Sequence, residues 1–325
     1  MNRHRIVVLL LALCAQAFAA AQAAAQTFPS KPIRMIVPYA PGGATDVLAR
    51  PIAQRLSEQV GQPVVVENRP GANATIGADH VAKSPPDGYT FFLGSIVHYM
   101  VPFFSKNVPY DPVKDFTPLA QVAVVPNILA VNPSLPIHSV KDLIDYAKKS
   151  GVKMHYGTTG TGSTHHLGGI FLAQTAGIPL EHVPYKGGNP AIQDVLSGSI
   201  PLVILTATTV MPQVKNGKLR ALGLIENRRF DVVPGVPTIG ESLPGYAVPD
   251  TWFGVLGPAG MPRPVVERLN AELRKAVQAA DVRQRIENIG MVPTGTAGVD
   301  EIAANVRSEV ETIRKIVTAA DIKPE

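Results

Sequence analysis

The chain has 325 residues, of which 46% are hydrophobic and 17% are charged. This length and composition allow one or two domains with a buried core and exclude extensive disorder. Lysine and arginine number 30 against 25 aspartate and glutamate, an excess of five that falls to three without Arg3 and Arg5. The basic residues are scattered, without runs or interleaved aromatic residues, so we expect no nucleic-acid partner.

Residues 1–25 have the pattern of a cleavable secretory signal peptide. A basic start precedes an apolar run over residues 6–15 that is too short to span a bilayer, and small residues follow. We expect cleavage before Gln26 and a mature protein in the periplasm that is not embedded in the membrane; an N-terminal anchor is the alternative. The single cysteine, Cys14, lies in this segment, so the mature chain has no thiol for disulfides, catalysis or metal binding.

Strand and helix patterns alternate through the rest of the chain. The first unit is a β-rich run over residues 33–37, followed by a glycine turn and a helical pattern through Leu48, Ile52 and Leu56. Later strand patterns lie at residues 64–67, 89–93, 155–157, 183–185, 202–205 and 219–225. Repeated units of this kind predict an α/β fold with mostly parallel sheets that are covered by helices on both faces.

Two long extended runs interrupt this alternation, over residues 121–131 and 252–256. We expect both to cross between two lobes. The predicted division places residues 26–131 and 246–325 in the first lobe and residues 132–245 in the second.

Two glycine-rich loops lead from a predicted strand into a predicted helix, at residues 41–46 and 157–164. In open parallel sheets, ligands bind at the carboxyl ends of the strands, where such loops lie. A helix start offers unpaired N–H groups and a partial positive charge, and glycine lets the backbone approach a ligand closely. Both loops are therefore candidate sites for a carboxylate; the alternative is that the glycines serve tight turns only.

Asp46 allows two interpretations. In the first turn of a helix it can interact with the helix dipole and pair with Arg50 four residues later. Turned toward a ligand, it would repel a carboxylate and attract the ammonium group of an amino acid.

The motifs of common enzymes are missing from this sequence. A phosphate-binding P-loop needs a lysine directly after its last glycine, but Ser163 follows Gly162. The dinucleotide-binding fingerprint G-x-G-x-x-G is incomplete, because His165 stands where its last glycine belongs. Neither G-x-S-x-G nor H-E-x-x-H occurs. The adjacent His165 and His166 point about 100° apart on a helix and suit one metal ion poorly. We therefore expect no enzyme, no cofactor and no metal; the alternative is a secreted serine hydrolase that uses Ser163 with His165 or His166.

Several further motifs are spread in order over the mature chain. They lie at residues 36–46, 67–72, 86–90, 110–118, 183–188, 217–222, 236–239 and 252–254. Together they resemble the Bug-type extracytoplasmic solute receptors of tripartite tricarboxylate transporters. This resemblance implies a type II periplasmic binding protein, a monomer whose two lobes close on a small carboxylate and deliver it to a membrane permease. A receptor that presents its ligand to a sensor kinase is the alternative.

The resemblance also implies a set of ligand-binding residues. In the first lobe these are Gly42, Gly43, Ala44, Thr45 and Asp46, with Ser95 and His98 at the end of the third strand. In the second lobe they are Thr159, Gly160, Gly162, Ser163, Thr164, Gly188, Asn189 and Thr206.

Two departures from the family pattern bear on the ligand. The family commonly has an acidic residue where residues 205–208 read Leu-Thr-Ala-Thr, so a cationic group on the ligand loses a partner here. Residues 95–100 are bulkier than the common pattern, which would suit an aromatic or longer apolar acid.

Overall fold

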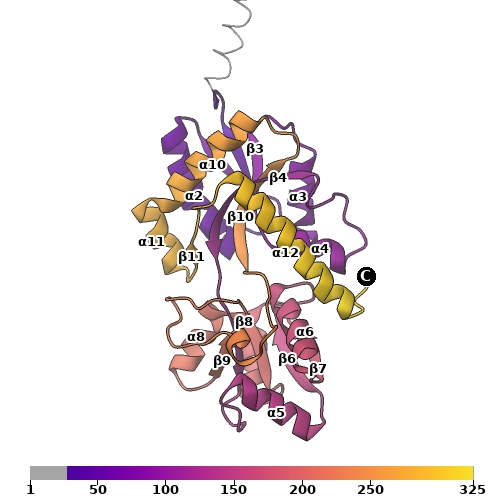
Figure 1. Ribbon diagram of the computed structural model, residues 1–325. Helices are drawn as coiled ribbons and strands as arrows, with labels where there is room; N and C mark the ends of the chain where they lie inside the picture. Colours follow the sequence, from indigo (N-terminus) through magenta and orange to yellow (C-terminus); the bar gives the residue numbers. More distant parts are fainter. Residues whose placement is uncertain (1–27, 325) are drawn as a thin grey trace, which may run out of the picture.

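The computed structural model describes residues 28–324, which form two α/β lobes arranged end to end (Figure 1). The predicted signal peptide, residues 1–25, lies outside the described residues. Within residues 28–324, every helix is too short or too polar to cross a membrane.

The first lobe is built on a six-stranded sheet with the order β11-β4-β10-β3-β1-β2. Its strands are β1 (Ile33–Val37), β2 (Val64–Asn68), β3 (Thr90–Ser95), β4 (Phe116–Val124), β10 (Trp252–Pro258) and β11 (Val292–Pro293). The first three strands are parallel, whereas β10 runs antiparallel to both β3 and β4. Strands from both ends of the chain therefore share this sheet.

Helices cover both faces of this sheet. They are α2 (Ala44–Val60), α3 (Thr75–Ala82), α4 (Val97–Phe104), α10 (Arg263–Gln278), α11 (Ala280–Asn288) and α12 (Val299–Ala319), with a 3₁₀ turn at Ala72–Ala74. In α2 the apolar positions Leu48, Ile52 and Leu56 recur every four residues, so one face of the helix is buried against the sheet. The helix ends at Gly61, whose φ of 71° suits glycine.

The second lobe is built on a five-stranded sheet with the order β7-β6-β8-β5-β9. Its strands are β5 (Asn127–Val131), β6 (Met154–Thr158), β7 (Leu180–Pro184), β8 (Leu202–Thr206) and β9 (Arg220–Leu224). Its helices are α5 (Val140–Ser150), α6 (Thr164–Ala176), α7 (Gly188–Ser197), α8 (Ala207–Lys215) and α9 (Ile239–Ser242). In the first sheet β10 and β11 run opposite to the other strands, and in the second sheet β5 runs opposite to the others.

The border between the two sheets falls earlier than the predicted lobe boundary after residue 131. Strand β5 belongs to the second sheet, where Asn127 pairs with Thr206 of β8. The extended pattern over residues 121–131 conceals a break, because Pro126 has no N–H group and ends the β4 ladder. Residues 127–131 are therefore part of the second lobe.

Helix α12 connects the lobes from outside. It packs on β4 in the first lobe and extends along α6 in the second (Figure 1). The side-chain amide of Gln174 in α6 donates a hydrogen bond to the carbonyl oxygen of Ile316 in α12, at 3.1 Å.

Candidate functional site

The carboxyl ends of the strands in both lobes lie at the two crossing segments. In the first lobe Ser95, the last residue of β3, pairs with Phe253 near the start of β10. In the second lobe Thr206, the last residue of β8, pairs with Asn127 at the start of β5. The crossing segments touch, since the N–H of Val125 donates to the carbonyl of Thr251 at 2.8 Å. The loops that follow β1, β3, β6 and β8 therefore emerge where the two lobes meet.

The first glycine-rich loop ends in an uncapped helix start. Gly43 is the N-cap of α2 and no side chain caps it; the first helical hydrogen bond runs from the N–H of Val47 to the carbonyl of Gly43, at 2.9 Å. The N–H groups of Ala44, Thr45 and Asp46 therefore have no partner within the helix. Gly43 and Ala44 are exposed, whereas Thr45 and Asp46 are buried, so an anion can reach this helix start from the side of Gly43 and Ala44.

The Asp46 carboxylate is engaged by its own loop. Its side chain is buried and accepts hydrogen bonds from Gly42 N–H at 2.9 Å, from Asn68 at 2.9 Å, and from Arg50 at 2.8 and 2.9 Å. Burial raises the pKa of Asp46, but the hydrogen bonds outweigh it and hold that pKa below its usual value. This geometry supports the structural interpretation of Asp46. It also means that the Gly42 N–H is not free for a ligand, because it already donates to the Asp46 carboxylate.

The second glycine-rich loop ends in a capped helix start. The Ser163 hydroxyl accepts from His166 N–H at 3.1 Å and donates to the Gly160 carbonyl at 2.7 Å. Because the helical ladder begins at Leu167, whose N–H donates to the Ser163 carbonyl, the N–H groups of Thr164 and His165 have no partner within the helix.

The serine and histidines of this loop do not form a catalytic pair. His165 contacts Thr159 through Nδ1 at 2.9 Å and Asn127 through Nε2 at 2.8 Å. His166 accepts the Gly162 N–H on Nδ1, at 3.2 Å. Both bonds of the Ser163 hydroxyl go to backbone groups, so no ring nitrogen is placed to take its proton, as a serine hydrolase requires.

His98 lies in the core of the first lobe and does not face a ligand. It is 2% exposed and packs among aromatic rings, with Tyr110 stacked at 5.2 Å and Phe116 edge-on at 4.5 Å. Burial lowers the pKa of His98 to about 3, against a hydrogen bond to Pro112 that raises it. The resemblance placed this residue at the strand end, but α4 begins at Val97 and turns the ring inward.

Ser95 does lie at the strand end, together with a tyrosine that the sequence analysis missed. Ser95 is buried, and Tyr39, which follows β1, is half-buried next to it. Burial raises the pKa of Tyr39, and the nearby Ser95 hydroxyl lowers it in part. The motif at residues 36–46 contains Tyr39, but nothing in the sequence alone distinguishes it from a core tyrosine.

The remaining predicted residues lie on the second lobe at the same edge as the second loop. Gly188 begins α7 and Asn189 is exposed beside it. The Thr206 hydroxyl is 2.9 Å from the hydroxyls of both Thr208 and Thr209. These residues surround the second loop because β7 and β8 flank β6 in the sheet.

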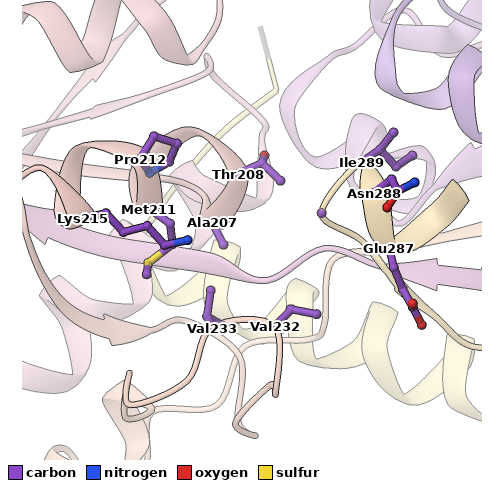
Figure 2. A pocket seen from close by; sticks show the side chains of 11 residues that line it. Ala207, Thr208, Met211, Pro212, Lys215, Val232, Val233, Glu287, Asn288 and Ile289 are labelled. Carbon is purple, nitrogen blue, oxygen red and sulfur yellow. The ribbon is translucent and has the colours of Figure 1, made fainter. Parts of the chain in front are cut away.

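A cavity of about 560 Å³ spans the two lobes next to Thr206 (Figure 2). The second lobe contributes α8, including Thr208, Met211 and Lys215, and the first lobe contributes the end of α11 with Ile289 and Gly290. Neither predicted loop lines this cavity. The helix start at Gly43 is exposed, and the one at Ser163 is half-buried.

These features define a class of protein. Two α/β lobes, two crossing segments, and helix starts from both lobes where the strands end are the architecture of a two-lobed solute-binding protein of periplasmic type II. Residues 48–321 match the family model described as the tripartite tricarboxylate transporter family receptor. The chain belongs to this family.

Relatives support the same assignment. Protein BugT of Bordetella pertussis is 34% identical over 327 residues, which cover 99% of this chain and 100% of the relative. A protein encoded in the tcbD-tcbE intergenic region of a Pseudomonas species is 39% identical over 293 residues, covering 89% of this chain and 86% of the relative.

Two solved structures with ligands are also similar. A Rhodopseudomonas palustris protein solved with adipate is 35% identical, with a TM-score of 0.76, over 92% of this chain and 100% of the other. MatC of the same species, solved with bound malate, is 30% identical, with a TM-score of 0.72, over 89% and 100% of the two chains.

Proposed function

We propose that this protein captures a small dicarboxylate in the periplasm, after removal of residues 1–25, and delivers it to the permease subunits of a tripartite tricarboxylate transporter. The observation that carries this proposal is the pair of helix starts, one in each lobe, whose free N–H groups lie where the two sets of strands end. The helix starts provide binding sites for two carboxylates, one on each lobe.

Main-chain donors can supply the affinity without a cationic side chain. A hydrogen bond to a charged group contributes about 1.5–3 kcal/mol, and Ala44, Thr45, Asp46, Thr164 and His165 offer N–H groups. Three or four such bonds approach the roughly −8 kcal/mol of a micromolar complex after the cost of association. Rotation about the crossing segments would bring the donors of one lobe onto a ligand already bound to the other.

The charged side chains near the site favour a simple acid over an amino acid. Asp46 is saturated by Arg50, Asn68 and Gly42, so it is not available to an ammonium group. The strand end at Thr206 carries hydroxyl groups where the family commonly has an acid. Adipate and malate, found in the two similar structures, are both dicarboxylates without a cationic group.

The proposed role is binding and release without chemical change, by a monomer that needs no cofactor. The bonding of Ser163 supports this, since its hydroxyl is held by backbone groups on both sides. Delivery to a permease is the step that family membership favours.

A thermal-shift screen of the mature protein tests the proposal. Mono-, di- and tricarboxylates, aromatic acids and acidic amino acids are compared at equal concentration, and hits are titrated by calorimetry. We expect dicarboxylates to raise the melting temperature and glutamate and aspartate to leave it unchanged. A screen in which no carboxylate binds refutes the proposed function.

A further inference from the structure

The orientation of one buried amide is fixed by its neighbours. Asn127, at the start of β5, is fully buried. Its Nδ2 lies 3.1 Å from the Val125 carbonyl, 2.6 Å from Glu226 Oε1 and 2.8 Å from Thr251 Oγ1. A backbone carbonyl can only accept a hydrogen bond, so the NH₂ group must face Val125. The amide oxygen Oδ1 therefore faces the other way, toward His165.

This orientation fixes the tautomer of His165. Oδ1 of Asn127 is 2.8 Å from Nε2 of His165 and can only accept, so Nε2 carries the proton. The imidazole is 5% exposed, and burial lowers the pKa of His165 to about 4. At neutral pH the ring is uncharged with a single N–H group, and Nδ1 is an acceptor.

The tautomer in turn fixes the direction of the hydrogen bond made by Thr159. Its Oγ1 is 2.9 Å from Nδ1 of His165, so the threonine hydroxyl donates its only proton to the ring. Thr159 is an exposed residue that directly follows β6, in the second glycine-rich loop. Toward a ligand, Oγ1 can therefore offer only lone pairs.

We infer that Thr159 is a specificity-determining residue that accepts a hydrogen bond from a hydroxyl group on the ligand, so that hydroxylated carboxylates are preferred to their deoxy counterparts. This inference rests on the proposed function for the ligand class. The lone pairs of Oγ1 repel a carboxylate, which binds instead at the N–H groups of Thr164 and His165. An ammonium group is disfavoured as the donor because Asp46 is already saturated.

The preference is measured with matched acids. Dissociation constants of malate and succinate, and of 3-hydroxybutyrate and butyrate, are determined by calorimetry for the wild type and for Thr159→Val. In the wild type we expect the hydroxylated acid to bind about five- to tenfold more tightly, the value of one neutral hydrogen bond. In Thr159→Val the ratio should fall close to one, mainly through weaker binding of the hydroxylated acid.

Thr161→Val is the matched control, because Thr161 is an exposed threonine of the same loop that does not contact His165. This variant should keep the wild-type preference. An unchanged preference in Thr159→Val, or a preference for the deoxy acids in the wild type, overturns the inference.

The direction of the hydrogen bond is tested without any ligand. Long-range ¹H–¹⁵N spectra of the ring nitrogens, assigned with His165→Gln, report the tautomer of His165. We expect the Nε2–H form, unchanged between about pH 5 and pH 8. The Nδ1–H form overturns the inference whatever the ligand data show. If no acid binds, the proposed function is refuted, and the specificity role of Thr159 with it. The measured tautomer of His165 still decides whether Thr159 donates its hydroxyl proton to the ring.

Discussion

The phenyl ring of Phe104, in α4 of the first lobe, lies 5.5 Å from the imidazole ring of His166, in α6 of the second lobe. The same phenyl ring covers the second glycine-rich loop, since a Cβ atom placed on Gly162 would lie 3.3 Å from its Cγ. Gly162 has a φ of 75°, which also favours glycine. The lobes are therefore in contact next to the proposed carboxylate site.

Replacing Phe104 with alanine should lower the affinity for the ligand more than it lowers the stability of the fold. The contact between Phe104 and the loop at Gly162 joins the two lobes, so its loss should favour their separation and raise the dissociation constant of a dicarboxylate by up to about tenfold. Small-angle scattering should show a larger radius of gyration without ligand. Phe103→Ala is the matched control, because that half-buried neighbour faces Arg314 at 5.4 Å instead of the loop. Equal loss of binding in both variants would show that the lobe contact has no special role.

A serine at position 43 should compete with the ligand. Gly43 has φ −70° and ψ 164°, which suit serine as an N-cap, and an added Cβ would lie 3.3 Å from the Ala40 carbonyl oxygen, so the loop must shift slightly. The hydroxyl of Gly43→Ser would then accept an N–H group that a carboxylate needs. We expect the melting temperature of the free protein to change little and the shift caused by dicarboxylates to be lost.

The control for this substitution is Gly298→Ser. Gly298 caps α12 with nearly the same geometry, φ −77° and ψ 163°, and an added Cβ meets nothing within 4 Å. This variant should keep the full ligand shift. A full ligand shift in Gly43→Ser as well would show that the first loop does not bind the carboxylate.

Removing the Ser163 hydroxyl should lower the stability of the protein without changing any hydrolysis of ester substrates. Ser163→Ala loses the cap of α6 and should cost about 1 kcal/mol of unfolding free energy. Ser139→Ala, which removes the corresponding cap of α5, should cost a similar amount and leave ligand binding intact. Neither variant should differ from wild type in hydrolysis of a chromogenic ester. Ester turnover that is lost only in Ser163→Ala would contradict a pure binding function.

Four histidines, three of them buried and His182 half-buried, should make the protein sensitive to acid. Burial lowers the pKa of His98 and His166 to about 3, and the pKa of His165 and His182 to about 4, from the ordinary 6.5. Below pH 6.5 the unfolded chain therefore binds protons that the folded chain does not. Stability should fall as the pH decreases from 6.5.

Two buried glutamates should have the opposite effect. Burial raises the pKa of Glu226 to about 8, against hydrogen bonds from Asn127 that lower it, and raises that of Glu309 to about 7. From pH 4.5 up to about 8 the folded chain retains protons that the unfolded chain releases, so this contribution decreases as the pH rises. Because the histidines outnumber the glutamates, the melting temperature should peak close to pH 6.5. A melting temperature that keeps rising from pH 6.5 to 8 would contradict these assignments.

The order of elements and both glycine-rich loops follow from local sequence patterns. Each loop stands between a β-rich run and a helical pattern, and the two loops do connect β1 to α2 and β6 to α6. The position of His98 could not be read in this way, because a histidine after a strand has the same local pattern whether it faces a ligand or an aromatic core. The break at Pro126 was hidden for a similar reason, since residues on both sides of it are equally extended and apolar.

Long-range hydrogen bonds decided which of the predicted donors are free. The sequence places Asp46 and Arg50 four residues apart, but the bond from Asn68 and the burial of the carboxylate arise only when β2 lies beside β1.

The amino-acid sequence by itself determined the two-lobed architecture, the family and the two loops, because these depend on local periodicity and on short motifs. Only the tertiary structure decided that Ser163 lacks a base, that Phe104 joins the lobes, and how Thr159 is bonded through His165 to Asn127. The physical reason is that hydrogen-bond direction and side-chain burial depend on neighbours that are distant in the chain, and no local pattern specifies those neighbours.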